Sequence, residues 1–208
     1  MALSNYTELQ TAIANWLDRD DLTAQIPDFI SLAEAYMNDD LRLRSMISEA
    51  TVTPSQVNKY VALPTGFKES ISFVDEVGEA LNQIHHEDLQ DMQYGTSSGG
   101  PEYYSVTSRI NFDRLASGAL SYTMTYYKAL DLASDTTNDV LTDYPNIYLY
   151  GSLLQAEPYL KNDKRIAVWN QMYNSAMKTA NNKAANSLKK LRTDHPSVVG
   201  SFDIVRGY

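Results

Sequence analysis

The feature that most constrains the fold of this chain is a long helical pattern over residues 143–191. Asp143 followed by Pro145 is typical of a helix start, because a carboxylate can cap the first turn and a proline there loses no hydrogen bond. Apolar residues then recur with the three-and-four spacing of one buried face. Pro158 is expected to end or kink this helix because it lacks the backbone N–H. A second helix is expected to begin at Asn162 and, if unbroken, to run about 40 Å at roughly 1.5 Å per residue.

The apolar stripe of this second helix is weak in its C-terminal half. Its members are Ile166, Trp169, Tyr173, Ala176, Ala180, Ala184, Leu188 and Leu191. Alanine and asparagine predominate between residues 180 and 186, and they offer little apolar surface to a core. We therefore expect the second half of the helix to pack against something outside its own domain.

The charge of the chain is distributed unevenly. Residues 1–160 contain 23 Asp and Glu against 8 Lys and Arg, a net charge of −15, and residues 161–208 contain 9 Lys and Arg against 3 Asp and Glu, a net charge of +6, which together give −9. An acidic body argues against general nucleic-acid binding, because phosphate contacts require basic residues. A basic arm suits an acidic surface instead, such as the body of a neighbouring copy. The helix macrodipole is the alternative explanation, and it accounts for the basic residues at 189–192 but not for those at 161–165.

Composition also limits the class of protein. The chain has no cysteine, which excludes disulfides and thiolate metal sites. Its first residues lack the basic and apolar regions of a signal peptide, and no apolar run approaches the ~20 residues of a membrane span. These features predict a soluble protein that folds in a reducing cytoplasm and does not enter a membrane.

One cluster resembles a metal or acid–base site, the run His85-His86-Glu87-Asp88. Adjacent side chains cannot all point at one ion, and the run lacks the i, i+4 histidine pair of a zinc helix. Nucleophile elbows and phosphate-binding glycine loops are missing from the sequence. We therefore predict a non-enzyme without metal or cofactor. The rival from another class is a metal-dependent hydrolase that uses His85, His86, Glu87 and an aspartate from the loop at 131–143.

Two further helices are expected near the N-terminus. Asn5 and Glu8 form a variant of the capping box before a first helix that ends near residues 19–21. A second helix is expected from about Pro27 to about Arg44, and the two form a helical hairpin. The expected buried positions are Leu9, Ile13, Trp16 and Leu17 in the first helix, and Ile30, Ala33, Met37 and Leu41, widened by Phe29, Leu32 and Tyr36, in the second.

From residue 49 the hydrophobic period changes from three-and-four to two, which predicts short strands. The alternation is clearest at Leu120, Tyr122, Met124 and Tyr126. A short helix is expected after His85, a flexible loop at 95–101 and a polar loop at 131–142. The fold class is therefore α+β: a helical bundle made of the N-terminal hairpin and the long C-terminal helices, with an inserted antiparallel β-meander and an extended C-terminal tail. The predicted domains are 1–48, 49–130, 131–192 and 193–208.

The aromatic residues and the tail favour contacts with other proteins. Fifteen tyrosines against five phenylalanines are typical of surfaces that are both apolar and wet, as protein interfaces are. The stretch after residue 191 is too irregular for a helix, yet it contains several large apolar residues. An apolar extended tail packs on its own body or adds to a partner.

Several phrases, in this order, resemble the head-to-tail adaptor proteins of tailed bacteriophages. They are Tyr6-Thr7-Glu8-Leu9, Ile13-Ala14-Asn15-Trp16-Leu17, Ile26-Pro27-Asp28-Phe29-Ile30, Ala33-Glu34-Ala35, Asp40-Leu41-Arg42-Leu43-Arg44, Leu63-Pro64-Thr65-Gly66-Phe67, Gly100-Pro101-Glu102-Tyr103-Tyr104, Tyr126-Tyr127, Asp143-Tyr144-Pro145 and Tyr148-Leu149-Tyr150-Gly151. The resemblance extends to about residue 188, and it is weakest in the tail from residue 193.

The resemblance implies a structural virion protein at the head–tail interface, assembled in the host cytoplasm. Such adaptors form a ring, usually dodecameric, beneath the portal protein, extend the DNA channel without sequence-specific binding, and carry the tail or nozzle. Their C-terminal region grips the portal, which implies docking residues at Lys189, Lys190, Arg192, Val198, Val199, Phe202, Ile204, Val205 and Arg206. The long helix is expected to contact neighbouring subunits through Trp169, Tyr173, Ala180, Ala184 and Leu188. A ring elsewhere in the tail, such as a tube or nozzle subunit, is the nearer alternative.

Overall fold

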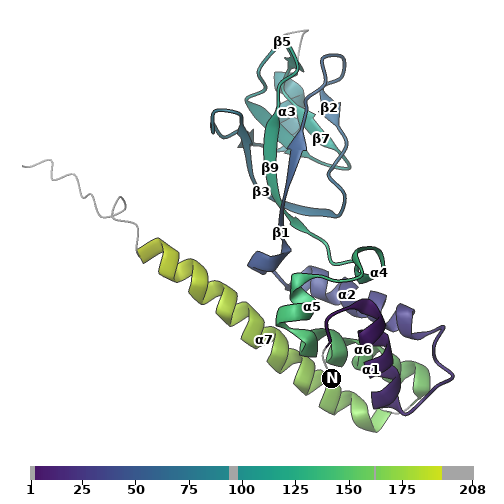
Figure 1. Cartoon of the computed structure of the whole chain (residues 1–208). Coiled ribbons are helices and arrows are strands. Elements are labelled where there is room, and N and C mark those ends of the chain that lie inside the picture. The colour runs from purple at the N-terminus through teal and green to yellow at the C-terminus, as the bar shows by residue number, and fades with distance from the viewer. Residues whose placement is uncertain (1–2, 94–97, 162, 194–208) are drawn as a thin grey trace, which may run out of the picture. The chain divides into compact units, whose positions relative to one another are not determined.

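The chain folds into two compact units in a computed structural model that describes residues 3–93, 98–161 and 163–193, with side chains in the last range from 164 to 185. The helical unit comprises residues 1–44 and 132–208, and the β unit comprises residues 45–131. Helices and antiparallel strands are both present, so the predicted α+β class is confirmed. Figure 1 labels the elements of each unit.

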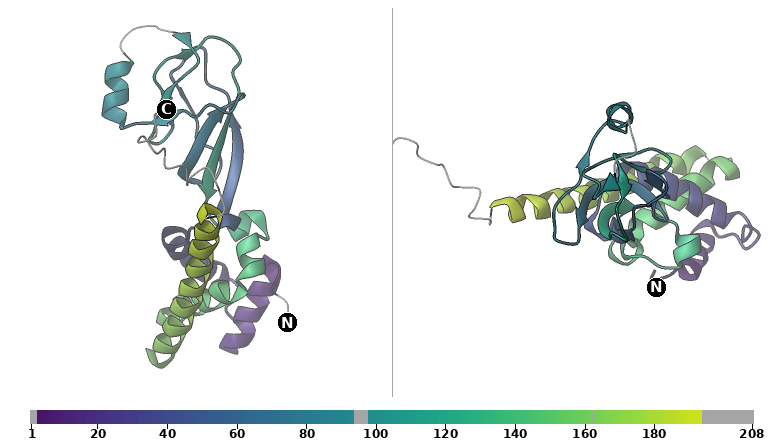
Figure 2. Two further views of the ribbon diagram at one scale, coloured as in Figure 1. Left: turned by 90° about the vertical axis from the view of Figure 1, so that its left-hand side faces the viewer. Right: turned by 90° about the horizontal axis from the view of Figure 1, so that it is seen from above.

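Helix α6 (Pro145–Leu160) is the centre of the helical unit. It packs against α1 (Tyr6–Leu17), α2 (Ile26–Asp40), α5 (Asp139–Asp143) and α7 (Asp163–Thr193). A helix with neighbours on several sides needs apolar residues around its whole circumference, and α6 has buried residues at consecutive positions from Ile147 to Leu149. The two views in Figure 2 show α7 alongside the other helices, with its C-terminal turns extending past them.

Gly151 allows α2 and α7 to approach α6 closely. A Cβ atom built at this glycine would lie 3.1 Å from a ring carbon of Tyr173 on α7 and 3.3 Å from the Cβ of Ala33 on α2. The missing side chain therefore marks where the three helices come closest. Helix α7 also contacts α2 through a hydrogen bond of 3.3 Å, which Asn181 Nδ2 donates to the carbonyl oxygen of Asp40.

The start of α1 follows the sequence pattern, whereas the start of α6 and the exposed faces differ from it. Asp143, which was predicted to cap this helix, is the last residue of α5, and α6 begins after Tyr144 without a side-chain cap. Asn5 caps α1 by accepting a hydrogen bond from the backbone N–H of Glu8 at 3.0 Å, as predicted. Trp16 is 46% exposed, and Leu32 and Tyr36 are 52% and 57% exposed, so their assignment to the core was wrong. Helix α2 also ends at residue 40, earlier than predicted. The buried face of α2 is a narrow stripe because one helix, α6, covers most of it.

The predicted polar loop at 131–142 was wrong, because it contains two short helices, α4 (Leu132–Asp135) and α5 (Asp139–Asp143). Leu132, Val140 and Leu141 are completely buried and hold these turns to the helical unit. Asn138 caps α5 by accepting a hydrogen bond from Leu141 N–H at 2.7 Å. A few buried apolar residues and one cap are therefore enough to order a segment that is polar in sequence.

A buried polar network ties α4 and α5 to α2 and α6. Glu34 Oε1 accepts hydrogen bonds from the Leu132 N–H at 2.8 Å and from the Tyr148 hydroxyl at 3.0 Å. The same hydroxyl accepts from Asn138 Nδ2 at 2.7 Å. Tyr173, on α7, is also buried, but its hydroxyl has no hydrogen-bond partner among the described residues. Tyr148 and Tyr173 can therefore be compared directly, because both are buried and only the Tyr148 hydroxyl has hydrogen-bond partners among the described residues.

Replacing Tyr148 by phenylalanine is expected to lower the free energy of unfolding by about 1–3 kcal/mol, because Glu34 and Asn138 each lose a buried partner. Tyr173→Phe removes a hydroxyl that makes no hydrogen bond, so it should leave stability unchanged or raise it by up to about 1 kcal/mol. Urea unfolding of both variants at neutral pH measures the difference. Equal losses in the two variants would contradict the network.

Tyr148 and Tyr173 also affect how stability changes at high pH. Burial raises the pKa of Tyr173 to about 12, and burial beside Glu34 raises the pKa of Tyr148 well above its ordinary value. Tyrosines of the unfolded chain ionise near pH 10, so the stability that these raised pKa values provide is present below pH 10 and falls as the pH rises. For Tyr173 the loss extends from about pH 10 to about 12, and the Tyr173→Phe variant should lack that part of the loss.

The β unit contains two sheets and a two-stranded ribbon. The first sheet has the order β1 (Ile47–Val52), β9 (Tyr122–Lys128), β3 (Phe67–Asp75), all antiparallel. The second has the order β2 (Tyr60–Val61), β7 (Ile110–Phe112), β6 (Tyr103–Val106), β4 (Asn82–Gln83), in which β4 pairs with β6 in parallel. The ribbon pairs β5 (Ser98–Gly99) with β8 (Leu115–Ala116), and α3 (His86–Met92) lies against β6. The predicted loop at 95–101 lies partly outside the described residues.

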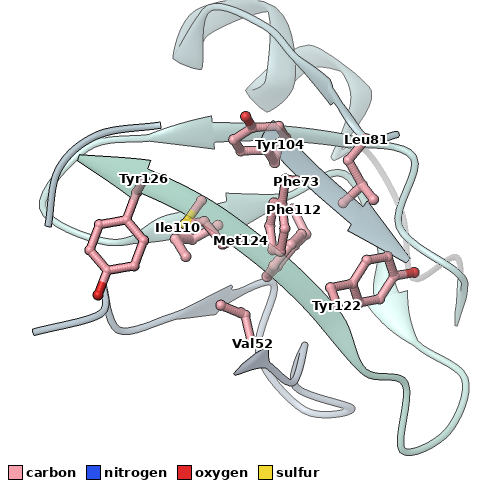
Figure 3. Close-up of a cluster of buried hydrophobic side chains, with 9 residues drawn as sticks. All are labelled: Val52, Phe73, Leu81, Tyr104, Ile110, Phe112, Tyr122, Met124 and Tyr126. Carbon is pink, nitrogen blue, oxygen red and sulfur yellow. The ribbon is translucent and has the colours of Figure 1, made fainter. Parts of the chain in front are cut away.

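The strand order is less local than consecutive hairpins, because β9 inserts between β1 and β3. The alternation predicted for β9 is confirmed: Tyr122, Met124 and Tyr126 are buried, and the residues between them are less so. Figure 3 shows these side chains with Phe73 and Phe112 in the core of the unit. Both sheets contribute to this core, so it holds the β unit together.

Candidate assembly surfaces of the helical unit

The helical unit has a groove between its α5–α6 connection and α7. Its volume is about 540 Å³, and Tyr144, Tyr150, Val168, Met172 and Lys183 are among the residues that line it. The side chains of Val168 and Met172 are 47% and 40% exposed, although both are large and apolar. The groove therefore has an uncovered surface of mixed polarity, in which the apolar Val168 and Met172 lie among polar residues that include Asp143, Gln171 and Lys183.

Aromatic rings meet beside this groove. Tyr150 stacks on Trp169 with ring centroids 6.1 Å apart, and Trp16 meets both rings edge to face, at 6.0 Å from Tyr150 and 5.6 Å from Trp169. Trp169 is buried and Tyr150 is half-buried, whereas Trp16 is exposed. The exposed Trp16 is therefore backed by two rings of its own unit, and exposed aromatic side chains are common in protein interfaces.

A buried carboxylate holds Trp169 in place. Trp169 Nε1 donates a hydrogen bond of 2.9 Å to Glu157 Oε1, and Arg165 Nε forms an ion pair of 3.2 Å with the same oxygen. The Glu157 side chain is completely buried, so the guanidinium and the indole N–H stabilise its charge. Its other oxygen, Oε2, has no partner within the described part of the chain. This arrangement fixes the start of α7 to the end of α6.

A second uncovered surface lies on α2, and we call it the α2 strip: Asp28, Leu32, Tyr36 and Asp39. Their spacing of four, four and three residues places them on one face of the helix. All four are exposed, and the opposite face, with Ala33 and Met37, packs against α6. The strip therefore consists of two large apolar side chains with a carboxylate at each end.

The residues predicted to contact neighbouring subunits have different places in the structure. Trp169, Tyr173 and Ala180 are buried within their own unit, and Ala184 is partly exposed. The side chain of Leu188 lies outside the described residues. Burial leaves Trp169, Tyr173 and Ala180 little surface for a neighbour, so their inter-subunit role stays a prediction. The exposed Val168 and Met172, on the neighbouring face of α7, were not predicted; their signal in the sequence is an apolar i, i+4 pair on an otherwise polar face.

The portal-docking residues predicted at 189–206 lie beyond the described side chains, and those from residue 198 lie outside the described chain.

The histidine run is built into the β unit. His86 Nδ1 lies 3.0 Å from Ser105 Oγ, and its Nε2 lies 3.1 Å from Gln90 Nε2. His85 precedes α3 as its N-terminal cap residue. Within the described ranges, no group of three His, Asp or Glu side chains is placed to hold a metal ion.

The chain matches the family described as SU10 adaptor protein over residues 4–195. The chain belongs to the SU10 adaptor protein family. This is a family of phage head-to-tail adaptors, so the predicted resemblance is confirmed. A comparison with curated proteins gave no match.

As a member of the SU10 adaptor family, the protein is a structural component of the phage virion that interacts with portal and tail components. No helix in the described part of the chain is both long and apolar enough to cross a membrane. The match covers both units. The groove and the α2 strip are therefore features of an adaptor, for which contacts with other subunits are the expected chemistry.

Proposed function

We propose that this SU10 adaptor forms a ring beneath the portal protein, extends the DNA channel and provides the platform on which the tail or nozzle assembles. The observation that carries this proposal is the family match over residues 4–195. The dodecameric number of subunits is part of the proposal, because it comes from the resemblance to phage adaptors.

The surfaces of the helical unit support a ring. A closed ring is built from head-to-tail contacts, in which two different surfaces of each subunit meet. The unit offers two uncovered surfaces that contain large apolar side chains, the groove beside α7 and the α2 strip. Exposed apolar side chains that gather in this way are used at protein interfaces.

The charge of the chain supports passage of DNA rather than binding of DNA. Residues 1–160 contain 23 acidic and 8 basic residues, so a channel lined by this body would repel phosphates. We propose that DNA slides through the ring without sequence-specific contacts. An electropositive channel wall in the assembled ring would contradict this part of the proposal.

We further propose that the basic C-terminal arm docks on the portal. The C-terminal turns of helix α7 extend beyond the other helices of the helical unit (Figure 1), and these turns include Lys189, Lys190 and Arg192. The proposed docking residues are those predicted from the sequence: Lys189, Lys190, Arg192, Val198, Val199, Phe202, Ile204, Val205 and Arg206.

Deleting residues 193–208 is expected to leave a folded protein that no longer co-sediments with portal-bearing heads. The body should remain folded because the buried side chains that the structure describes lie at or before Ala180. Co-sedimentation with purified heads and circular dichroism of the free protein measure the two properties. A truncated protein that still binds heads would show that docking lies elsewhere.

The full-length variant with His85→Ala and His86→Ala is the matched control. It should co-sediment as the parent chain does, because neither histidine belongs to the proposed docking arm. Loss of assembly in this variant would favour the rival reading in which the histidines are functional. An electron micrograph of the particle distinguishes a ring at the portal from the alternative, a tube or nozzle ring lower in the tail.

A further inference from the structure

We infer that β1 binds an extended segment of a tail component as an additional strand of the first sheet. The binding site is the β1 edge, which consists of the backbone N–H and C=O groups of Ile47–Val52 that face away from β9. The inference rests on the proposed function. It adds which element of the β unit holds the tail and what kind of segment the partner supplies.

The β1 edge is open in the described structure. β1 pairs with β9 over its full length and is the outermost strand of its sheet. Among the described residues, no hydrogen bond other than those of the β9 pairing reaches Ile47–Val52. Successive residues of an antiparallel strand direct their backbone groups alternately toward and away from the partner. About half of the backbone groups of β1 are therefore available to a further strand.

The other sheet edges of the β unit are protected against such pairing. β3, on the opposite side of the first sheet, has two irregularities of register with β9. Its C-terminal half is also paired on the outer side, where the Phe73 carbonyl oxygen accepts a hydrogen bond from the Leu81 N–H at 2.8 Å. The edge strands of the second sheet, β2 and β4, have two residues each. Short, irregular or covered edges resist pairing with another chain.

β1 is a regular edge by comparison. Its six residues include no proline, and its register with β9 is continuous. Ile47, Glu49 and Thr51 are exposed on one face, while Val52 on the other face is buried. Main-chain hydrogen bonds to such an edge provide affinity, and alternate side chains provide specificity. Because Glu49 is the charged residue of β1, a bound strand is favoured if it places a basic side chain beside this carboxylate.

The described strands of a second copy do not fit this edge in a ring. Two β1 edges would pair about a two-fold axis, whereas the contacts that repeat around a cyclic ring join unlike surfaces. The other described strands are central in their sheets, irregular in register or only two residues long. Adaptors of this family interact with portal and tail components, and the C-terminal arm is already proposed to dock on the portal. The strand is therefore assigned to a tail component.

Amide hydrogen exchange of peptides that cover residues 47–52 tests the inference. It is measured on heads that carry the adaptor before tail attachment and on complete phage particles. The β1 amides that face away from β9 should exchange quickly in the heads and at least about tenfold more slowly in the complete particles. Peptides from β9, the central strand of the same sheet, are the control and should be protected equally in both.

Photo-cross-linking identifies the partner. The photo-reactive amino acid p-benzoylphenylalanine replaces Glu49, and irradiated particles should contain a covalent product with a tail component, identified by mass spectrometry. The same replacement of Val77, an exposed residue of the β unit outside β1, is the matched control and should give no such product. Thr51, which is also exposed on β1, provides the reading if the Glu49 variant does not yield particles.

Several results would overturn the inference. If the β1 peptides exchange at the same rate in heads and in complete particles, no strand is added when the tail attaches. A cross-link between two copies of this chain would assign the edge to a second copy, and an equal yield from Val77 would place the contact outside β1. Particles whose micrographs contain no ring of this protein would instead contradict the proposed function, whatever is measured at the β1 edge.

Discussion

A Phe73→Ala variant is expected to lower the stability of the β unit by about 3–5 kcal/mol. Phe73 is almost fully buried, and its ring contacts the rings of Tyr104, Phe112 and Tyr122 at centroid distances of 5.1, 6.1 and 5.7 Å. Truncation removes the apolar contacts of both sheets at once and leaves a cavity that the surrounding strands can fill only in part. Hydrogen exchange of peptides from residues 45–131 measures the loss in this unit.

Val77→Ala is the matched control for Phe73. Val77 belongs to the same unit, is apolar and is highly exposed, so its truncation should change stability by no more than about 0.5 kcal/mol. If both variants showed similarly small losses, Phe73 could not be the centre of the core.

The second large effect is expected in the helical unit, where Trp169→Ala should lower the free energy of unfolding by about 3–5 kcal/mol. The substitution removes a buried ring from contact with Trp16 and Tyr150. It also removes the indole N–H that Glu157 accepts at 2.9 Å, which leaves a completely buried carboxylate with fewer partners. Denaturant unfolding followed by the fluorescence of Trp16, the other tryptophan of the chain, measures the loss in this unit.

Met172→Ala on the same helix separates stability from assembly. Met172 lies on the exposed face of α7, so its truncation should cost less than about 1 kcal/mol in the free protein. If a neighbouring subunit of the proposed ring covers the groove, the substitution should nevertheless weaken assembly. A loss of stability as large as that of Trp169→Ala would mean that the groove is part of the core and is not available to a neighbour.

The sequence predicted those features that depend on local pattern. The start of α1 at Asn5 and the alternation of β9 both follow from short-range chemistry, and both are present. The order of strands could not be predicted this way, because the insertion of β9 between β1 and β3 depends on pairing between distant segments. The short helices α4 and α5 were missed because each has few apolar residues, and it is the tertiary packing of Leu132, Val140 and Leu141 that orders them.

The candidate surfaces could likewise be predicted only in part from the local sequence pattern. Helical periodicity indicates which residues share a face, but it does not indicate whether another element covers that face. Leu32 and Tyr36 were therefore assigned to the core, although α6 covers only the side of α2 that carries Ala33 and Met37. The sequence did indicate that this face is exposed, since aspartates at positions 28 and 39 continue the same stripe. Carboxylates are seldom fully buried, so a stripe that begins and ends with them is more often exposed.

The central place of α6 also determines the order in which the chain can fold during synthesis. The inner faces of α1 and α2 are completed by a helix that begins only at Pro145, whereas every described strand of the β unit has been synthesised once Lys128 is added. We therefore expect the β unit to become compact on the ribosome first, while the first two helices still expose apolar surface. In the proposed ring, this delay keeps the groove beside α7, which needs both α6 and α7, from forming until the chain is nearly complete.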